Sequence, residues 1–202
     1  VVAEYLSNFP EETIELANDN SFPIFLADKD IPYADIIKGI TELIIKDKED
    51  IIYEMKIDKI LKSGKDKEIV ELAYNINSNF MQNLIVFNLT NCDIGSSADY
   101  ICQTINSRDM WSALKYKDGI LIIITNDEKD QIKNQINYIL DLVQDTCDDY
   151  VIGISNYHKD LKYIKKAIIE ATTSCEFSNI LNNNIVNYAE LELYSILVPM
   201  KQ

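Results

Sequence analysis

The residues in this chain that are best able to do chemistry are its cysteines and its single histidine. The cysteines are Cys92, Cys102, Cys147 and Cys175, widely spaced and without a CxxC pair that could hold a metal ion. We therefore predict four reduced thiols in or near the core of a cytosolic protein. His158 cannot build a histidine metal site alone, and its position in a turn after a strand predicts a solvated loop residue.

No other arrangement of reactive residues predicts catalysis. The 5 glycines are scattered, so no glycine-rich loop is available to cradle a phosphate. Most Asp and Glu residues stand beside Lys in helical stretches, which is typical of a solvated surface. Trp111 and the tyrosines could stack on a planar effector, although such aromatics more often belong to the core or its rim. We expect no catalytic residues, no metal site and no cofactor.

Composition excludes several classes of protein. The 202 residues are 47% hydrophobic, which is enough to bury one full core or two small ones. The formal net charge of -14 repels phosphate backbones and argues against direct nucleic-acid binding. No apolar run approaches the ~20 residues of a membrane span. The opening VVAEYLSNFPEE also lacks the features of a signal peptide, so we predict a cytoplasmic protein without a membrane contact.

The stretch from Tyr150 to Cys175 predicts one β-α unit. Tyr150 to Ile152 forms a short buried strand, and Gly153 to Tyr157 forms a turn. The following helix carries a stripe of residues at steps of three and four, which lie on one helical face and face the core: Leu161, Ile164, Ile168, Ala171 and Cys175.

The rest of the second half predicts an α+β fold, a single sheet with helices on one face. The Asp-Gly turn at Lys117-Asp118-Gly119 lies between two extended runs and predicts a hairpin. Strands are expected at Leu84 to Leu89, Trp111 to Tyr116, Ile120 to Thr125 and Ile185 to Tyr188. Short helices are expected at Ala98 to Asn106 and Glu190 to Leu197. A long helix is expected to begin at a cap formed by Asn126 or Asp127.

The first half predicts two different segments. The expected order in residues 1-46 is β-α-β-α, with strands at Val1 to Tyr5 and Phe22 to Leu26, and such an order implies parallel strands at the end of a larger α/β domain. Residues 47-79 are densely charged and predict two helices interrupted near Ser63-Gly64-Lys65. These helices are either a solvated pair packed on the core or a connector between domains that also dimerises.

Several of these motifs resemble a known family. Val151-Ile152-Gly153-Ile154-Ser155, followed by Glu170-Ala171 and by a strand ending at Tyr188 with Leu191 beyond it, is similar to the central domain of the PucR/CdaR regulators. These are bacterial transcription factors named for purine catabolism and sugar-diacid use, and their central domain is a degenerate relative of the GGDEF diguanylate-cyclase fold. The family's helix usually carries Ser-Tyr-x-Glu-Ala, of which this chain keeps Glu-Ala and lacks Ser-Tyr.

The first fifty residues resemble the end of the PucR-type amino-terminal sensor domain, at Phe9-Pro10, Phe22-Pro23-Ile24 and Tyr33 to Ile37. The two resemblances together imply four parts: the end of a sensor domain (1-46), a helical connector (47-79), a GGDEF-like regulatory domain (80-190), and the start of a helix (191-202). In the family that helix leads to a DNA-binding helix-turn-helix, which is not in this chain.

The resemblance also implies where a ligand would bind. A working diguanylate cyclase needs carboxylates for two metal ions and a Gly-Gly-Asp/Glu-Glu-Phe loop. The first strand carries Asn88, Thr90 and Asn91 where the family has its metal-binding Asp. The loop corresponds to the neighbourhood of Tyr116 to Ile120, and its expected ligand-binding residues are Lys117, Asp118 and Gly119. Neutral side chains do not replace carboxylates around divalent ions, so we expect an inactive cleft in which these six residues bind an effector.

The expected function is therefore the effector-sensing and dimerising region of a PucR/CdaR-type transcriptional regulator. The effector is an unidentified small molecule, the protein is a homodimer because palindromic operators demand two-fold partners, and DNA is reached only through the carboxy-terminal helix-turn-helix. The alternative is a stand-alone sensor whose degenerate GGDEF module binds a nucleotide or cyclic dinucleotide. A third option is an interaction scaffold without a small ligand.

Overall fold

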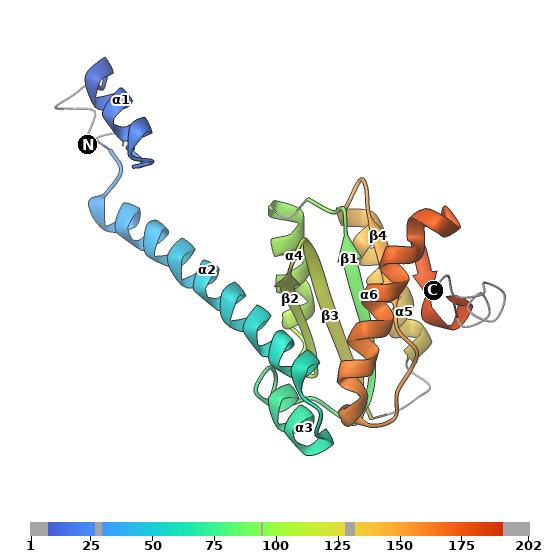
Figure 1. Ribbon diagram of the computed structural model, residues 1–202. Coiled ribbons are helices and arrows are strands. Elements are labelled where there is room, and N and C mark those ends of the chain that lie inside the picture. Colours follow the sequence, from blue (N-terminus) through green and yellow to red (C-terminus); the bar gives the residue numbers. More distant parts are fainter. Residues whose placement is uncertain (1–7, 27–29, 94, 128–131, 192–202) are drawn as a thin grey trace. The chain divides into compact units, whose positions relative to one another are not determined.

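The computed structural model describes residues 8–26, 30–93, 95–127 and 132–191 (Figure 1). The chain divides into two compact units, one on each side of the junction between Lys48 and Glu49. The second unit contains the sheet and all of the elements that position the candidate site.

The first unit consists of α1 (Glu11–Asp19) and the first part of α2 (Tyr33–Lys62). The strand predicted at Val1 to Tyr5 lies outside the described residues. The buried strand predicted at Phe22 to Leu26 is wrong: this run is irregular, and Phe22 and Phe25 are each 69% exposed. A strand needs a neighbour for its backbone groups and cover for its side chains, and the described part of this unit offers neither.

The helix predicted to begin after Pro32 continues as one 30-residue helix, α2, through the junction of the two units to Lys62. The predicted interruption near Ser63-Gly64-Lys65 is confirmed, because α3 (Asp66–Tyr74) begins only after it. Although α2 is long, no helix in the described part of the chain is apolar enough to cross a membrane.

A five-stranded mixed sheet forms the centre of the second unit, which confirms the α+β class. Its strands are β1 (Asn83–Thr90), β2 (Trp111–Tyr116), β3 (Gly119–Asn126), β4 (Val151–Ile154) and β5 (Ile185–Asn187). They lie in the order β2-β3-β1-β4-β5; only the β4–β5 pair is parallel. The predicted hairpin is confirmed, since β2 and β3 are adjacent antiparallel strands joined at Lys117 and Asp118.

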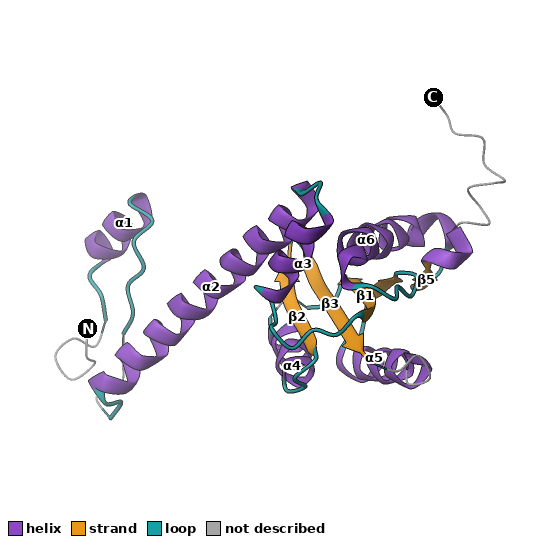
Figure 2. Cartoon of the chain, turned by 90° about the horizontal axis from the view of Figure 1, so that it is seen from below, coloured by secondary structure: helices purple, strands orange, loops and turns teal. Residues whose placement is uncertain are grey.

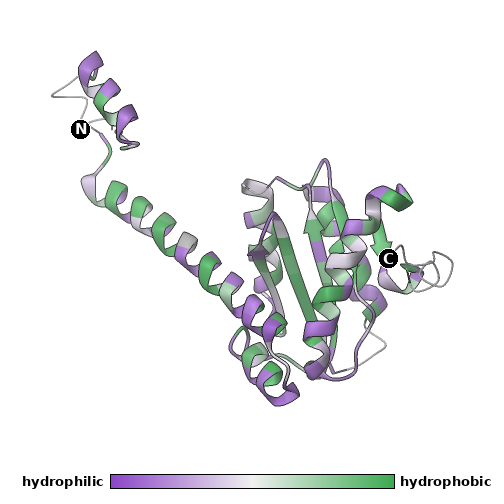
Figure 3. Cartoon of the chain, viewed as in Figure 1, coloured by the Kyte–Doolittle hydropathy of each residue, from purple (hydrophilic) through white to green (hydrophobic). Residues whose placement is uncertain are grey.

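Helices cover both faces of the sheet, so the prediction of helices on one face is wrong (Figure 2). On one face α4 (Ser96–Asn106) and α5 (Ile132–Thr146) pack against Phe87 and Leu89. On the other face α6 (Ile164–Leu181), α3 and the end of α2 pack against Leu84 and Val86. The reason is that nearly all consecutive residues of β1 and β3 are buried, and Figure 3 shows β3 coloured as hydrophobic along its length. Because successive side chains of a strand point to opposite faces, such strands need a layer of cover on each face.

Several boundaries differ from the sequence prediction, mostly by one or two residues. Asn126 is the last residue of β3 rather than a helix cap, and the residues just before α5, 128–131, lie outside the described part. β4 extends to Ile154, two residues further than predicted. A short 3-10 helix, Leu161–Tyr163, precedes α6, and the predicted helix at Glu190 to Leu197 is described only as far as Leu191.

Gly153 allows β4 to lie directly against α6. A side chain at this position would overlap the carbonyl oxygen of Ala171, the amide of Cys175 and the Cβ of Ser174. Gly153 pairs with Asn88 of β1, so the close contact also brings α6 alongside β1. The absence of a side chain at one residue thus sets the distance between the sheet and α6.

A disulfide joins Cys92, which follows β1, to Cys147, which follows α5. The prediction of four reduced thiols is therefore wrong for these two residues, while Cys102 and Cys175 form no disulfide with a described residue. Their Cα atoms lie 5.4 Å apart although the residues are 55 positions apart in the chain, so only tertiary packing brings them together.

Replacing Gly153 by Ala should lower the free energy of unfolding by roughly 1–3 kcal/mol, because the new methyl group meets backbone atoms that are unable to move aside. Urea denaturation measures the change. Gly64→Ala is the matched control, since nothing lies within 4 Å of a Cβ there. Equal stability of the two variants would contradict the contact between β4 and α6.

Replacing Cys92 and Cys147 together by Ser should lower the free energy of unfolding by roughly 2–4 kcal/mol, because the bond closes a long loop in the unfolded chain. Denaturation without reductant measures the loss, with Cys102→Ser as the control at a cysteine outside this disulfide. Rapid alkylation of both Cys92 and Cys147 in the native, unreduced protein would show that the bond does not form.

Candidate ligand-binding site at the hairpin

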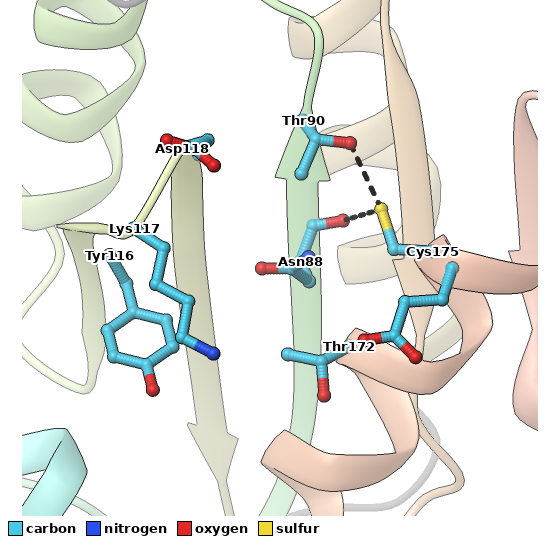
Figure 4. A pocket seen from close by; sticks show the side chains of 9 residues that line it. Asn88, Thr90, Tyr116, Lys117, Asp118, Thr172 and Cys175 are labelled. Atoms are coloured by element: carbon cyan, nitrogen blue, oxygen red, sulfur yellow. Dashed lines mark hydrogen bonds between the residues drawn. The ribbon is translucent and has the colours of Figure 1, made fainter.

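A pocket of about 220 Å³ opens where the turn of the β2–β3 hairpin faces the end of β1 and the middle of α6 (Figure 4). We call it the hairpin pocket. It is lined by Asn88, Thr90, Tyr116, Lys117, Asp118, Gly119, Thr172, Cys175 and Glu176.

The structure brings five of the six residues of the predicted ligand site to this pocket. Asn88 and Thr90 point to the same side of β1 because strand residues two apart share a face. Lys117, Asp118 and Gly119 reach the pocket because Gly119 pairs with Thr90. The sixth residue, Asn91, does not line it: it is exposed, beyond the end of β1, with a left-handed φ of 63°.

Sequence reasoning missed four of the lining residues. Tyr116 lies in the stretch that aligns with the family's loop, but it is not among the predicted ligand-binding residues. The other three, Thr172, Cys175 and Glu176, are spaced to share one face of α6. Their position opposite β1 depends on the contact at Gly153, which the sequence pattern does not reveal.

Cys175 connects α6 to β1 at the wall of the pocket. Its Sγ lies 3.2 Å from Thr90 Oγ1 and donates to the carbonyl oxygen of Asn88 at 3.5 Å. Figure 4 shows both interactions beside the opening between the hairpin and α6. The thiol therefore serves as a hydrogen-bonding group of this wall, and two neutral polar side chains, Asn88 and Thr90, lie beside it.

The charges around the pocket are few and mixed. Lys117 and Asp118 are exposed at the turn, and Lys117 Nζ lies 5.2 Å from the ring centroid of Tyr116. Asp118 and Glu176 are the only carboxylates among the lining residues. In the described part of the chain, no group of three or more His, Cys, Asp or Glu side chains is placed to hold a metal ion. The arrangement suits hydrogen bonding to a small polar molecule.

Tyr116 also reaches out of the pocket to α2. Its hydroxyl donates to Asp58 Oδ1 at 3.2 Å, and the tyrosine is only 3% exposed. Burial, together with the hydrogen bond to Asp58 and the negative charges of Asp58 and Glu54, raises the pKa of Tyr116 to about 12. The hydroxyl therefore stays protonated and remains a donor at any physiological pH.

A second polar cluster lies at the start of α6, away from the lining residues of the pocket. The buried carboxylate of Glu170 accepts from the amide of Asn156 at 3.0 Å and lies 2.8 Å from His158 Nε2. The side chain of His158 is only 10% exposed, so the prediction of a solvated loop histidine is wrong. Backbone pairing between His158 and Leu84 of β1 draws the loop onto the sheet.

Glu170 is ionised despite its burial. Burial alone would raise the pKa of Glu170, but the hydrogen bond and charge interaction with His158, the amide of Asn156 and the charge of Lys166 hold it below its ordinary value. Among the described residues Oε1 has no hydrogen-bond partner, and it forms an ion pair with Lys166 Nζ at 3.6 Å. The solvated surface predicted for most acidic residues therefore does not apply to Glu170.

Comparisons of the chain with models of protein families, with curated proteins and with solved structures found no match.

Replacing Glu170 by Gln should lower the free energy of unfolding at pH 7 by roughly 1.5–3 kcal/mol, the usual contribution of hydrogen bonds to a charged group. Because the folded pKa of Glu170 lies below the unfolded one, its contribution is complete above the unfolded pKa, about 4.5, and is lost as the pH falls through the folded pKa. The difference between wild type and variant should therefore shrink on acidification.

Urea denaturation at pH 7 and at pH 3.5 measures both differences. Glu176→Gln is the control, an exposed carboxylate on the same helix whose replacement should change stability little at either pH. A Glu170→Gln effect that is equally large at both pH values would contradict the ionised, paired state of Glu170.

Proposed function

We propose that this chain is the effector-sensing and dimerising region of a PucR/CdaR-type transcriptional regulator, with an inactive GGDEF-like domain and with its DNA-binding helix-turn-helix carboxy-terminal to it. The observation that carries the proposal is the hairpin pocket. Two motifs that are about thirty residues apart in the sequence, at Asn88 to Thr90 and at Lys117 to Gly119, meet there.

The order of the helices and strands also supports the proposal of a GGDEF-like domain. The elements from β1 to β4 form a split β-α-β unit: β1, α4, the β2–β3 hairpin, α5 and β4 follow one another in the chain. Their strands lie in the sheet order β4-β1-β3-β2, and α6 and β5 are added after them. The proposed family's central domain derives from the GGDEF fold, in which the nucleotide binds between the first strand and the hairpin. The hairpin pocket lies between these same elements. Topology alone assigns no function, so the chemistry of the pocket decides which role is proposed.

That chemistry favours sensing over catalysis. Diguanylate cyclases hold two metal ions with carboxylates, whereas the wall formed by β1 carries the neutral groups Asn88 and Thr90. At the turn, Lys117 has a φ of 52°, a conformation that favours glycine, and it stands where the family's loop carries glycine. The pocket therefore has hydrogen-bonding groups for a ligand but not the ligands for two metal ions.

Dimerisation is proposed from the surface of α2. Exposed large apolar side chains recur along this helix in both units: Ile37, Ile40, Leu43, Ile44 and Ile45 in the first, and Ile51, Ile52 and Met55 in the second. Contiguous exposed apolar residues mark surfaces that bind another protein. A second copy of the chain is the partner that a regulator of palindromic DNA sites requires. The net charge of -14 agrees with DNA contacts made by another domain.

The proposed role implies a cytoplasmic location, where a disulfide such as Cys92–Cys147 is unusual. Disulfides are rare in reducing compartments, where those that occur are mostly transient or redox-sensing. A cytoplasmic regulator would therefore carry these two cysteines reduced for part of its life. Thiol trapping of the protein in intact cells shows which form is present.

The proposal is tested by a ligand screen followed by calorimetry. The panel contains purine bases, sugar diacids, GTP with Mg²⁺ and cyclic di-GMP. We expect a purine or a diacid to raise the melting temperature and to bind with a measurable Kd. Thr172→Phe should abolish this binding by filling the pocket, whereas Thr173→Phe, at a partly buried neighbour outside the lining, should leave the Kd unchanged.

The other outcomes discriminate between the alternatives. Magnesium-dependent binding of GTP, or binding of cyclic di-GMP, would favour the stand-alone nucleotide sensor. Failure of every compound to bind at millimolar concentration would contradict a sensing role and would leave the interaction scaffold as the better proposal.

A further inference from the structure

Two walls of the hairpin pocket, the hairpin and α6, also contact the end of α2. On the hairpin side, Tyr116 lines the pocket with its ring, and its hydroxyl donates to Asp58 of α2 at 3.2 Å. The preceding residue, Lys115, lies 3.8 Å from Asp50 of the same helix. A shift of the end of β2 therefore changes contacts at two positions that are about two turns apart on α2.

The other wall, α6, reaches the last turn of α2. Lys165 Nζ donates to the carbonyl oxygen of Ser63 at 2.8 Å, directly after the last residue of α2, where helix carbonyls lack partners within the helix. Ser63 Oγ in turn donates to Glu68 Oε2 of α3 at 2.8 Å. The helix that supplies Thr172, Cys175 and Glu176 to the pocket thus also caps α2 and contacts the α2–α3 joint.

We propose that the hairpin pocket and the carboxy-terminal half of α2 form one allosteric unit, in which Tyr116 and α6 transmit the occupancy of the pocket to α2. The inference rests on the proposed sensing role of this pocket and names the element that it regulates. A ligand between the hairpin and α6 touches both walls, so it binds one arrangement of these walls, and hence of α2, better than another.

The direction of the effect follows from the geometry of Tyr116. Tyr116 lines the pocket and its hydroxyl is bonded to α2, so a group inserted next to Thr172 that displaces Tyr116 misaligns the hydrogen bond to Asp58. Occupancy therefore loosens α2 around Asp58. By reciprocity, any event in α2 that releases Asp58 alters the affinity of the pocket by the same factor.

Thr172→Phe serves as the probe, because it fills the pocket without a ligand. Hydrogen–deuterium exchange of the amides from Ile57 to Lys62 reports on α2. We expect exchange about fivefold faster than in wild type, which corresponds to the loss of one side-chain hydrogen bond. Thr173→Phe is the matched control on the same helix and should leave these amides unchanged.

Tyr116→Phe separates transmission from general loosening. This variant keeps the ring in the pocket and removes only the hydroxyl, so it should by itself accelerate exchange in α2 by a similar factor. Adding Thr172→Phe to Tyr116→Phe should then produce little further change, because both substitutions act through the same hydrogen bond.

Two results would overturn the inference: unchanged exchange of α2 in the Thr172→Phe variant, or additive effects of the two substitutions. Should Thr172→Phe unfold the chain, Thr172→Leu inserts a smaller group at the same lining position, and the same two results decide. None of these measurements uses the natural effector. Failure of the ligand screen and failure of this coupling are therefore separate outcomes.

Discussion

The contact between β4 and α6 at Gly153 determines how the polar residues of α6 lie against the sheet. Because Gly153 has no side chain, the backbone of α6 lies against the sheet beside Asn88. One face of the helix then supplies Thr172, Cys175 and Glu176 to the hairpin pocket. An earlier turn buries Glu170 against His158, and Lys165 reaches Ser63. A wider separation between sheet and helix would remove all three sets of interactions together.

The two polar clusters along α6 differ in whether their charged groups are buried or exposed. Glu170 is buried and ionised, and its pairing with His158 and Asn156 makes the loop after β4 part of the core. Such a buried pair is costly to break but contributes mainly to a specific arrangement. The hairpin pocket instead has neutral groups on its inner walls and keeps its charges, Lys117, Asp118 and Glu176, at exposed positions. One helix thus carries the buried, paired Glu170 on one turn and lining residues of the hairpin pocket on the next.

In the proposed sensing role, the long helix α2 is the element on which a bound ligand would act. Its end is held by the hairpin through Asp50 and Asp58 and by α6 through Ser63, while its start belongs to the other compact unit. The exposed apolar residues along it are suited to contact a second copy of the chain. A pocket that changes the support of α2 therefore acts on the same element that we propose for dimerisation.

The sequence by itself determined the class of the fold and most of its elements. Hydrophobic periodicity and turn residues act locally, so the strands at Leu84 to Leu89 and Ile120 to Thr125, the hairpin and the break near Gly64 were predictable. Local patterns also suggested a strand at Phe22 to Leu26, which has no partner among the described residues. Only the tertiary structure decided that helices cover both faces, that Cys92 meets Cys147, that His158 is buried on Glu170, and that α6 completes the pocket. These features join residues far apart in the chain, and their geometry depends on close packing around single positions such as Gly153, which no local pattern encodes.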